Sequence, residues 1–197
     1  MSRARNKAIV EKQIELRQKL WPQITATDLW LRKERDGFAT IPRTLPLIMS
    51  IMDALTGKGK RVSSAYLVLW CQVMDEVFFE VKNEQALAFA CGFEGERGVR
   101  TWRERMRDLQ KLGFIDFKPG ASGDITYILI LNPYHAIRRH RDKRDPAITE
   151  KRYNSLIARA HEIKASDMDE ALPDDPITRP APPRKKFVEA LNDDIPF

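Results

Sequence analysis

The order of the short elements between Ser63 and Asn132 constrains the fold of this chain more than any other feature of its sequence. Apolar residues recur every three or four positions in its helical stretches and alternate in its extended ones. Gly92 and Gly113 follow two of the helical stretches, as is common at helix ends. The predicted elements are a helix over 63–75, a strand over 77–81, helices over 84–90 and 99–112, and strands over 114–118 and 125–131. This order predicts a mainly α-helical fold with a small β-sheet, in the α+β class.

The same order of elements resembles that of winged helix-turn-helix DNA-binding domains. The stretch Leu109–Ile115, with the sequence Leu-Gln-Lys-Leu-Gly-Phe-Ile, also resembles the usual exit from the third helix of that fold into the wing. The resemblance implies a winged-helix core over residues 63–135. In such a core the helix over 99–112 would face DNA and the following hairpin would form the wing.

The helix predicted over 99–112 has two chemically different faces. Its apolar residues share one face at helical spacing and should point into the core: Val99, Trp102, Met106, Leu109 and Leu112. Its cations share a neighbouring face: Arg100, Arg103, Arg107 and Lys111. On a DNA-facing helix these cations would contact phosphates or a groove. The alternative is a solvated face that Glu104 and Asp108 partly neutralise.

Further basic and aromatic residues surround this helix. The segment from Arg138 to Arg144 is a basic cluster, which is either a second phosphate-contacting site or a charged helix end or linker. On the predicted wing, Tyr127 and Phe117 either stack on bases or pack in the core, whereas the phase of Trp102 favours the core. The predicted DNA-contacting residues are Arg97, Arg100, Arg103, Arg107, Lys111, Lys118, Tyr127, Arg138, Arg139 and Arg141.

Charge is unevenly distributed along the chain, whose formal net charge is +6. Residues 97–144 contain twelve Lys and Arg against five Asp and Glu, whereas residues 166–197 contain four against eight. This asymmetry favours a body that binds polyanions and a tail that does not. Ordinary solvated surface is the alternative explanation.

The chain divides into four predicted segments. Residues 1–62 form a helical region that packs on the core, with helices over 3–20, 27–34 and 45–55. Residues 63–135 form the winged helix, and residues 136–165 contain the basic cluster and a last helix over 149–164. Prolines interleaved with charges predict a disordered tail over residues 166–197.

The last five residues of the sequence, Asp193, Asp194, Ile195, Pro196 and Phe197, resemble the C-terminal tip of bacterial single-stranded DNA-binding proteins. The resemblance implies that the tail docks host replication and repair proteins that recognise such tips. A terminal phenyl ring would fill an apolar pocket, the main-chain carboxylate would meet an Arg or Lys, and the aspartates would meet a basic rim.

Several other function classes are disfavoured. His135, His140 and His161 lack metal-ligand spacing, and Gly57-Lys58-Gly59-Lys60 lacks the Walker pattern of a phosphate-binding loop and a preceding strand. Cys71 and Cys91 are expected to be buried thiols, as in a reducing cytoplasm. No catalytic constellation is visible, and no apolar run approaches the ~20 residues that span a membrane. The sequence therefore predicts a cytoplasmic non-enzyme that uses no metal or cofactor.

Together these features favour a protein that binds single-stranded DNA and recruits tip-recognising proteins, encoded by a plasmid, phage or conjugative element. The alternative is a duplex-specific plasmid or phage replication initiator or transcription regulator. A third class is an adaptor or decoy that occupies tip-binding pockets without DNA. The sequence leaves open whether the chain forms a homo-oligomer.

Overall fold

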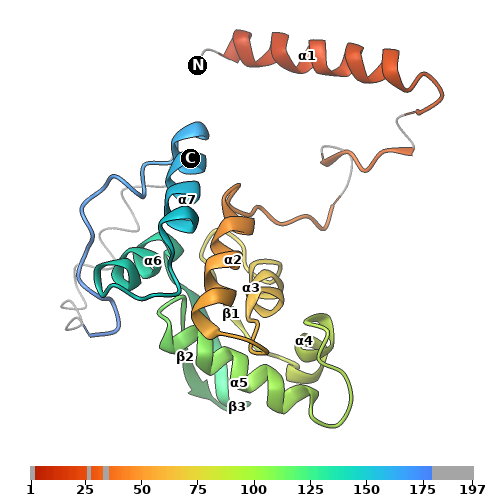
Figure 1. The fold of residues 1–197 in the computed structure, drawn as a ribbon. Helices are drawn as coiled ribbons and strands as arrows, with labels where there is room; N and C mark the ends of the chain where they lie inside the picture. Colours follow the sequence, from red (N-terminus) through yellow and green to blue (C-terminus); the bar gives the residue numbers. More distant parts are fainter. Residues whose placement is uncertain (1–2, 26–27, 33–35, 179–197) are drawn as a thin grey trace, which may run out of the picture. The chain divides into compact units, whose positions relative to one another are not determined.

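The structure is a computed structural model that describes residues 3–25, 28–32 and 36–178 (Figure 1). Its described residues form seven α-helices and one three-stranded antiparallel sheet, which confirms the predicted α+β class. The elements are α1 (Arg3–Leu20), α2 (Leu45–Thr56), α3 (Ser63–Trp70), β1 (Phe78–Glu80), α4 (Glu84–Ala90), α5 (Gly98–Lys111), β2 (Ile115–Gly120), β3 (Gly123–Ile130), α6 (Pro133–Asp142) and α7 (Glu150–Glu162).

The described residues divide into two compact units, one that ends at Phe38 and one that begins at Ala39, whereas the predicted boundary lies after residue 62. In the first unit, α1 has the predicted bounds. The helix predicted over 27–34 is wrong for residues 28–32, which contain no α-helix. The carboxylate of Asp28 accepts hydrogen bonds from the backbone N–H and the hydroxyl of Thr25 at 2.9 and 2.7 Å. Such local side-chain bonds compete with helical ones and favour a turn. The packing of residues 1–38 on the core stays a prediction.

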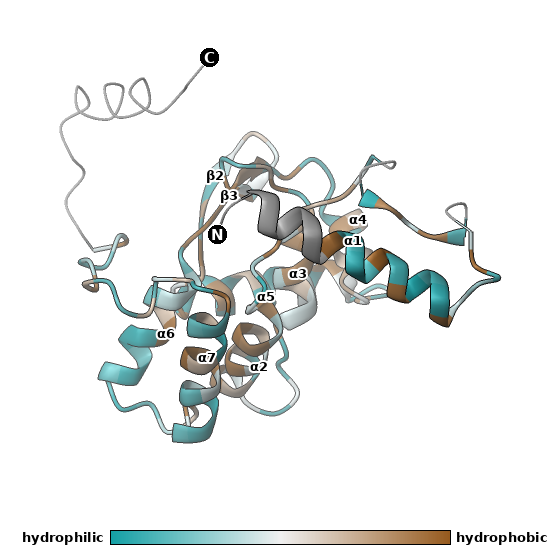
Figure 2. Cartoon of the chain, turned by 90° about the horizontal axis from the view of Figure 1, so that it is seen from above, coloured by the Kyte–Doolittle hydropathy of each residue, from teal (hydrophilic) through white to brown (hydrophobic). Residues whose placement is uncertain are grey.

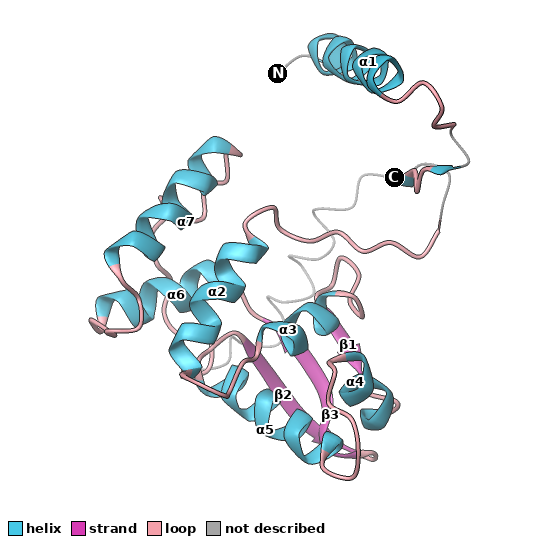
Figure 3. Cartoon of the chain, turned by 45° about the vertical axis from the view of Figure 1, so that its right-hand side comes forward, coloured by secondary structure: helices cyan, strands magenta, loops and turns pink. Residues whose placement is uncertain are grey.

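The sheet of the second unit has the strand order β1-β3-β2, with β3 in the centre. Helices α3 and α5 lie over one face of it (Figure 3). The core between helices and sheet includes Trp102, Tyr66 and Phe114, which are fully buried. The ring of Tyr66 meets that of Phe114 edge-on, with centroids 6.1 Å apart. Aromatic residues of this size bury the most apolar area and so stabilise the unit most.

Local chemistry sets the bounds of α4 and α5. The side chain of Asn83 caps α4 by accepting a hydrogen bond from the backbone N–H of Ala86 at 3.0 Å. Gly98 is the first residue of α5 and lies close to the backbone of Phe93. A Cβ at Gly98 would be 2.3 Å from the carbonyl oxygen of Phe93. No side chain fits in that space, so the turn between these two helices requires glycine.

Helix α3 is shorter than predicted, because it ends at Trp70 instead of continuing to residue 75. Its buried face consists of Ala65, Tyr66 and Leu69. Met74, which lies beyond the end of the helix, is 89% exposed. Cys71 was predicted to be buried and is also exposed, since it lies just beyond the end of the helix. Cys91 is buried as predicted, and burial raises the pKa of its thiol to about 12.

Helix α2 is largely apolar (Figure 2). It buries Leu45, Ile48, Ile51 and Met52 and contacts α3, α6 and α7. Just before it, the hydroxyl of the buried Thr44 is hydrogen-bonded to that of Tyr134 on α6. This bond joins residues that are 90 positions apart in the sequence.

Helix α6 was not predicted as a helix. It begins with Asn132, whose side chain accepts a hydrogen bond from the backbone N–H of Tyr134 at 2.9 Å, and with Pro133 in its first turn. Asparagine followed by proline is a helix-start signal. The last predicted helix is present as α7, which buries Leu156 and Ala160.

The segment after Ala165 lies against α6 in its described part, and this corrects the prediction of a disordered tail that starts at residue 166. Met168 is buried, and the Arg138 guanidinium donates hydrogen bonds to the carbonyl oxygens of Asp167 and Glu170 at 3.0 and 2.7 Å. The side chain of Asn132 donates to the carboxylate of Asp167 at 3.0 Å. Residues 179–197 lie outside the described residues.

Candidate functional site

Helix α5 has the two faces that its sequence predicts. Trp102, Met106 and Leu109 are fully buried. On the opposite side the four cations are exposed: Arg100, Arg103, Arg107 and Lys111. We call these four residues the α5 stripe. Because Trp102 is enclosed in the core, it cannot stack on a base.

Ion pairs engage part of the α5 stripe. The Arg103 guanidinium donates to one carboxylate oxygen of Glu84 on α4 from Nε at 2.9 Å and from Nη2 at 2.5 Å. The hydrogen bonds and charge of Glu84 raise the pKa of Arg103 above its ordinary value. Arg100 pairs with Glu104 at 3.1 Å, with 80% of the Arg100 side chain exposed. Exposed pairs of this kind contribute only about 0–1 kcal/mol, so a phosphate can displace them.

Three of the predicted DNA-contacting residues on or next to α5 form no such ion pair. Within the described residues, Arg97, Arg107 and Lys111 take part in no ion pair. Arg97 is the N-cap residue of α5, and Lys111 is its last residue. Unpaired cations are therefore present at both ends and along the exposed side of the helix.

The face of the sheet that carries Tyr127 displays a second group of exposed residues. Tyr127 on β3 and Phe78 on β1 are 37% and 49% exposed, and their rings are stacked with centroids 6.1 Å apart. Leu129, opposite Phe78, is 39% exposed. Phe117 lies opposite the buried Ile128 and so belongs to the core face. Sequence reasoning missed Phe78, because only the pairing of β1 with β3 brings its ring against that of Tyr127.

Lys118 lies on β2 directly opposite Tyr127. Its ammonium group is 2.9 Å from the carboxylate of Asp116, and 72% of its side chain is exposed. Burial alone would raise the pKa of Asp116, but hydrogen bonds from Gln110 and Lys118 hold it below its ordinary value. Lys118 therefore presents a cation beside the stacked rings, partly balanced by Asp116.

The three predicted arginines of α6 make intramolecular bonds. Arg138 holds the segment after Ala165, as described above. Arg139 donates to the carbonyl oxygens of Pro173 and Asp174 at 2.9 and 3.2 Å. Arg141 pairs with Glu150 and lies over the ring of Tyr153. These contacts give Arg138, Arg139 and Arg141 a structural role, and their contact with DNA stays a prediction.

The remaining predictions concern metal ligands, membrane-spanning helices and the C-terminal docking residues. The described residues contain no group of three or more His, Cys, Asp or Glu that could hold a metal ion. No helix in that part of the chain is long and apolar enough to cross a membrane. The predicted docking residues Asp193, Asp194, Ile195, Pro196 and Phe197 lie outside the described residues. No protein-family model, curated protein or solved structure matches the chain.

Proposed function

We propose that this chain is a non-enzymatic DNA-binding protein whose second unit is a winged helix-turn-helix domain. The observation that carries the proposal is the α5 stripe, which is exposed on the side of the helix opposite the buried Trp102, Met106 and Leu109. The order of elements and the strand order β1-β3-β2 are those expected of a winged helix-turn-helix domain. In such a domain α5 approaches DNA and the β2-β3 hairpin lies beside it.

Binding to phosphates explains the composition of this surface. Arg97, Arg107 and Lys111 would contact backbone phosphates directly, and Arg100 and Arg103 would exchange their carboxylate partners for phosphates. Each neutralised phosphate releases counterions, which makes the affinity strongly dependent on salt. Contacts of this type position the protein without reading sequence.

The stacked Phe78 and Tyr127 rings favour single-stranded DNA as the ligand. Exposed aromatic rings stack on unpaired bases, and every base offers a face for such stacking. Lys118 beside these rings would contact the strand's backbone. The α5 stripe also fits the major groove of a duplex, which supports the second candidate, a duplex-specific replication initiator or transcription regulator.

The proposal includes a docking role for the residues Asp193–Phe197. It rests on the resemblance of their sequence to the tip of bacterial single-stranded DNA-binding proteins. A DNA-bound body that also recruits tip-recognising proteins would act at replication forks or single-stranded gaps. A plasmid, phage or conjugative element is the source that such a protein suggests.

Titration of matched single-stranded and duplex oligonucleotides at two salt concentrations tests the proposal. Replacing Arg100, Arg103 and Arg107 with Gln should weaken binding and flatten its salt dependence, because about three fewer phosphates are neutralised. The matched control replaces Arg17, Lys19 and Lys143 with Gln, which removes the same charge elsewhere. Equal losses in both variants would reduce the α5 stripe to ordinary surface charge. Tight binding to one duplex sequence with weak single-strand binding would establish the second candidate.

A further inference from the structure

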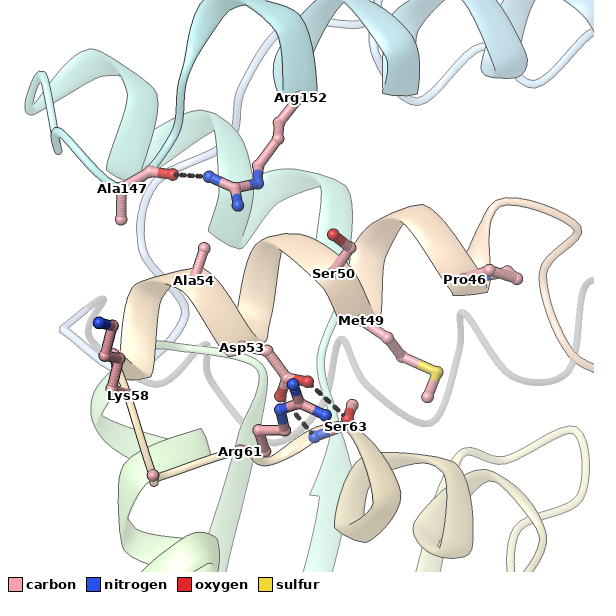
Figure 4. Close-up of a pocket in the computed structure, with 12 residues that line it drawn as sticks. Pro46, Met49, Ser50, Asp53, Ala54, Lys58, Arg61, Ser63, Ala147 and Arg152 are labelled. Carbon is pink, nitrogen blue, oxygen red and sulfur yellow. Dashed lines mark hydrogen bonds between the residues drawn. The ribbon is translucent and has the colours of Figure 1, made fainter.

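A groove lies along α2 and is bordered by the N-terminal half of α7 and by the loop between α2 and α3 (Figure 4). Its volume is about 740 Å³. A second cavity of about 400 Å³ continues it between α2 and α7, and both are lined by Ser50 and Arg152. The groove and its continuation therefore form one open path along α2, which we call the α2–α7 groove.

Cations line both walls of the α2–α7 groove. Lys58 and Arg61 come from the loop, and Lys151 and Arg152 come from α7. None of these four takes part in an ion pair within the described residues, in contrast to Arg100 and Arg103 on α5. Arg152 is oriented by a hydrogen bond that it donates to the carbonyl oxygen of Ala147 at 3.3 Å, drawn in Figure 4. Four cations around one groove, against the single carboxylate of Asp53, attract an anionic ligand.

The single acid that lines the larger cavity, Asp53, is hydrogen-bonded to the start of α3. One carboxylate oxygen of Asp53 accepts hydrogen bonds from the backbone N–H groups of Val62 and Ser63 at 2.9 and 3.0 Å. The other accepts from the Ser63 hydroxyl at 2.7 Å. Asp53 thus stabilises the N-terminal end of α3, where a negative charge is favourable. Its negative charge offsets only one of the four positive charges that line the groove and its continuation.

The loop that carries Lys58 and Arg61 is held in shape by contacts outside the groove. Gly57 and Gly59 adopt φ values of 77° and 76°, which residues with side chains rarely adopt. The Arg105 guanidinium on α5 donates to the carbonyl oxygen of Gly59 at 3.3 Å and pairs with Asp108 at 3.2 Å. The loop therefore borders both α5 and the groove, and its backbone is held without a ligand.

We propose that the α2–α7 groove binds the sugar-phosphate backbone of the same nucleic acid that α5 contacts, and this inference rests on the proposed function. An open path with cations on both walls suits a chain of phosphates. No aromatic residue lines either cavity, so bases gain no stacking there. The groove therefore adds affinity without sequence or base preference. The groove contacts phosphates through side-chain cations. It is therefore not a Walker loop, whose sequence pattern the chain lacks.

Fluorescence anisotropy of oligothymidylates of increasing length, with the full chain, tests the inference. The variant replaces Lys58, Arg61 and Arg152 with Gln, and the matched control exchanges Lys for Arg and Arg for Lys at the same positions. Short oligonucleotides that engage only α5 should bind the variant like wild type. Long ones should bind it at least tenfold more weakly, with a salt slope reduced by about two, and the control should stay close to wild type. Circular dichroism and thermal unfolding check that each variant is folded.

Two results would overturn the inference. Equal loss at all lengths would show a general charge effect and no separate groove contact. Binding of inorganic tripolyphosphate that requires Lys58, Arg61 and Arg152, with unchanged affinity for long oligonucleotides, would assign the groove to a free phosphate ligand. The Gln variant of Arg100, Arg103 and Arg107 separates this inference from the proposed function. If that variant binds short oligonucleotides like wild type, the α5 interface fails whatever the groove does.

Discussion

The rings of Phe78 and Tyr127 stack across β1 and β3 with their planes inclined by 19°. Both rings are partly exposed on a sheet whose other face is packed with buried residues such as Ile128 and Ile130. Aromatic pairs on neighbouring strands stabilise a sheet modestly, by about 0.2–1 kcal/mol. We propose that their position next to Lys118 makes them a stacking platform for unpaired bases.

Replacing Phe78 or Tyr127 with Ala should weaken binding of single-stranded DNA. Base–aromatic stacking contributes about 1–3 kcal/mol per base, which corresponds to a loss of about 5- to 150-fold. Duplex affinity should change little, because paired bases are not free to stack on the sheet. Anisotropy titrations of both ligands measure the effect, with Met74→Ala as a control at an exposed apolar residue outside the sheet. An equal loss for both ligands would count against the platform.

Replacing Glu84 with Gln should raise DNA affinity a few-fold. The substitution removes a negative charge beside the α5 stripe and frees the Arg103 guanidinium for phosphate. The gain should shrink as salt is added, since screening weakens exposed charges. Glu162→Gln is the control, because Glu162 pairs with Arg159 on α7. An unchanged affinity in Glu84→Gln would mean that this side of α5 does not face the ligand.

Replacing Gly98 with Ala should destabilise the second unit by about 1–3 kcal/mol or more, because the new Cβ meets the carbonyl oxygen of Phe93. Chemical denaturation followed by circular dichroism measures the change in the free energy of unfolding. Arg100→Ala, on the exposed side of the same helix, should stay within about 0.5 kcal/mol of wild type. A stable Gly98→Ala variant would show that the turn between α4 and α5 relaxes easily.

Stability should fall in mildly acidic solution because of His135. Burial, with the nearby charges of Arg139 and Arg138, lowers the pKa of His135 from its ordinary 6.5. The unfolded chain therefore binds this proton at a higher pH than the folded chain does, and the stabilisation by neutral His135 is lost as the pH falls below about 6.5. Thermal unfolding across this range should show a smaller decline in His135→Gln than in wild type. Parallel declines would assign the acid sensitivity to other groups.

Deleting Phe197 should abolish recovery of tip-recognising host proteins and leave the fold unchanged. Such aromatic anchors commonly account for about 2 kcal/mol or more of binding. Pull-downs compare wild type, the deletion and a variant extended by a few residues, which moves the terminal carboxylate. Equal recovery by all three would show that the tip does not act as a docking peptide.

Local sequence signals predicted much of this fold and less of its surface chemistry. Asn83, Gly92 and the apolar spacing of α5 gave bounds that match the structure closely, since caps and periodicity act within a few residues. The end of α3 was misjudged because apolar residues continue past Trp70. The role of Arg138 could not be predicted, since its partners are carbonyl oxygens about thirty positions later in the chain. The α2–α7 groove was missed for the same reason, because only the fold brings Lys58 and Arg61 opposite Arg152.

The hydrogen bond between Thr44 and Tyr134 has a consequence for biosynthesis. Helix α2 is among the first parts of the second unit to be made, yet its buried face needs α6 and α7 to cover it. While the ribosome is still translating β3, the apolar side of α2 has no such cover and the Thr44 hydroxyl has no partner. Contacts between distant parts of a chain form late and expose apolar surface in the meantime. The nascent chain therefore exposes part of the apolar face of α2 until α6 and α7 have been made, and a pause in translation before Pro133 would lengthen that period.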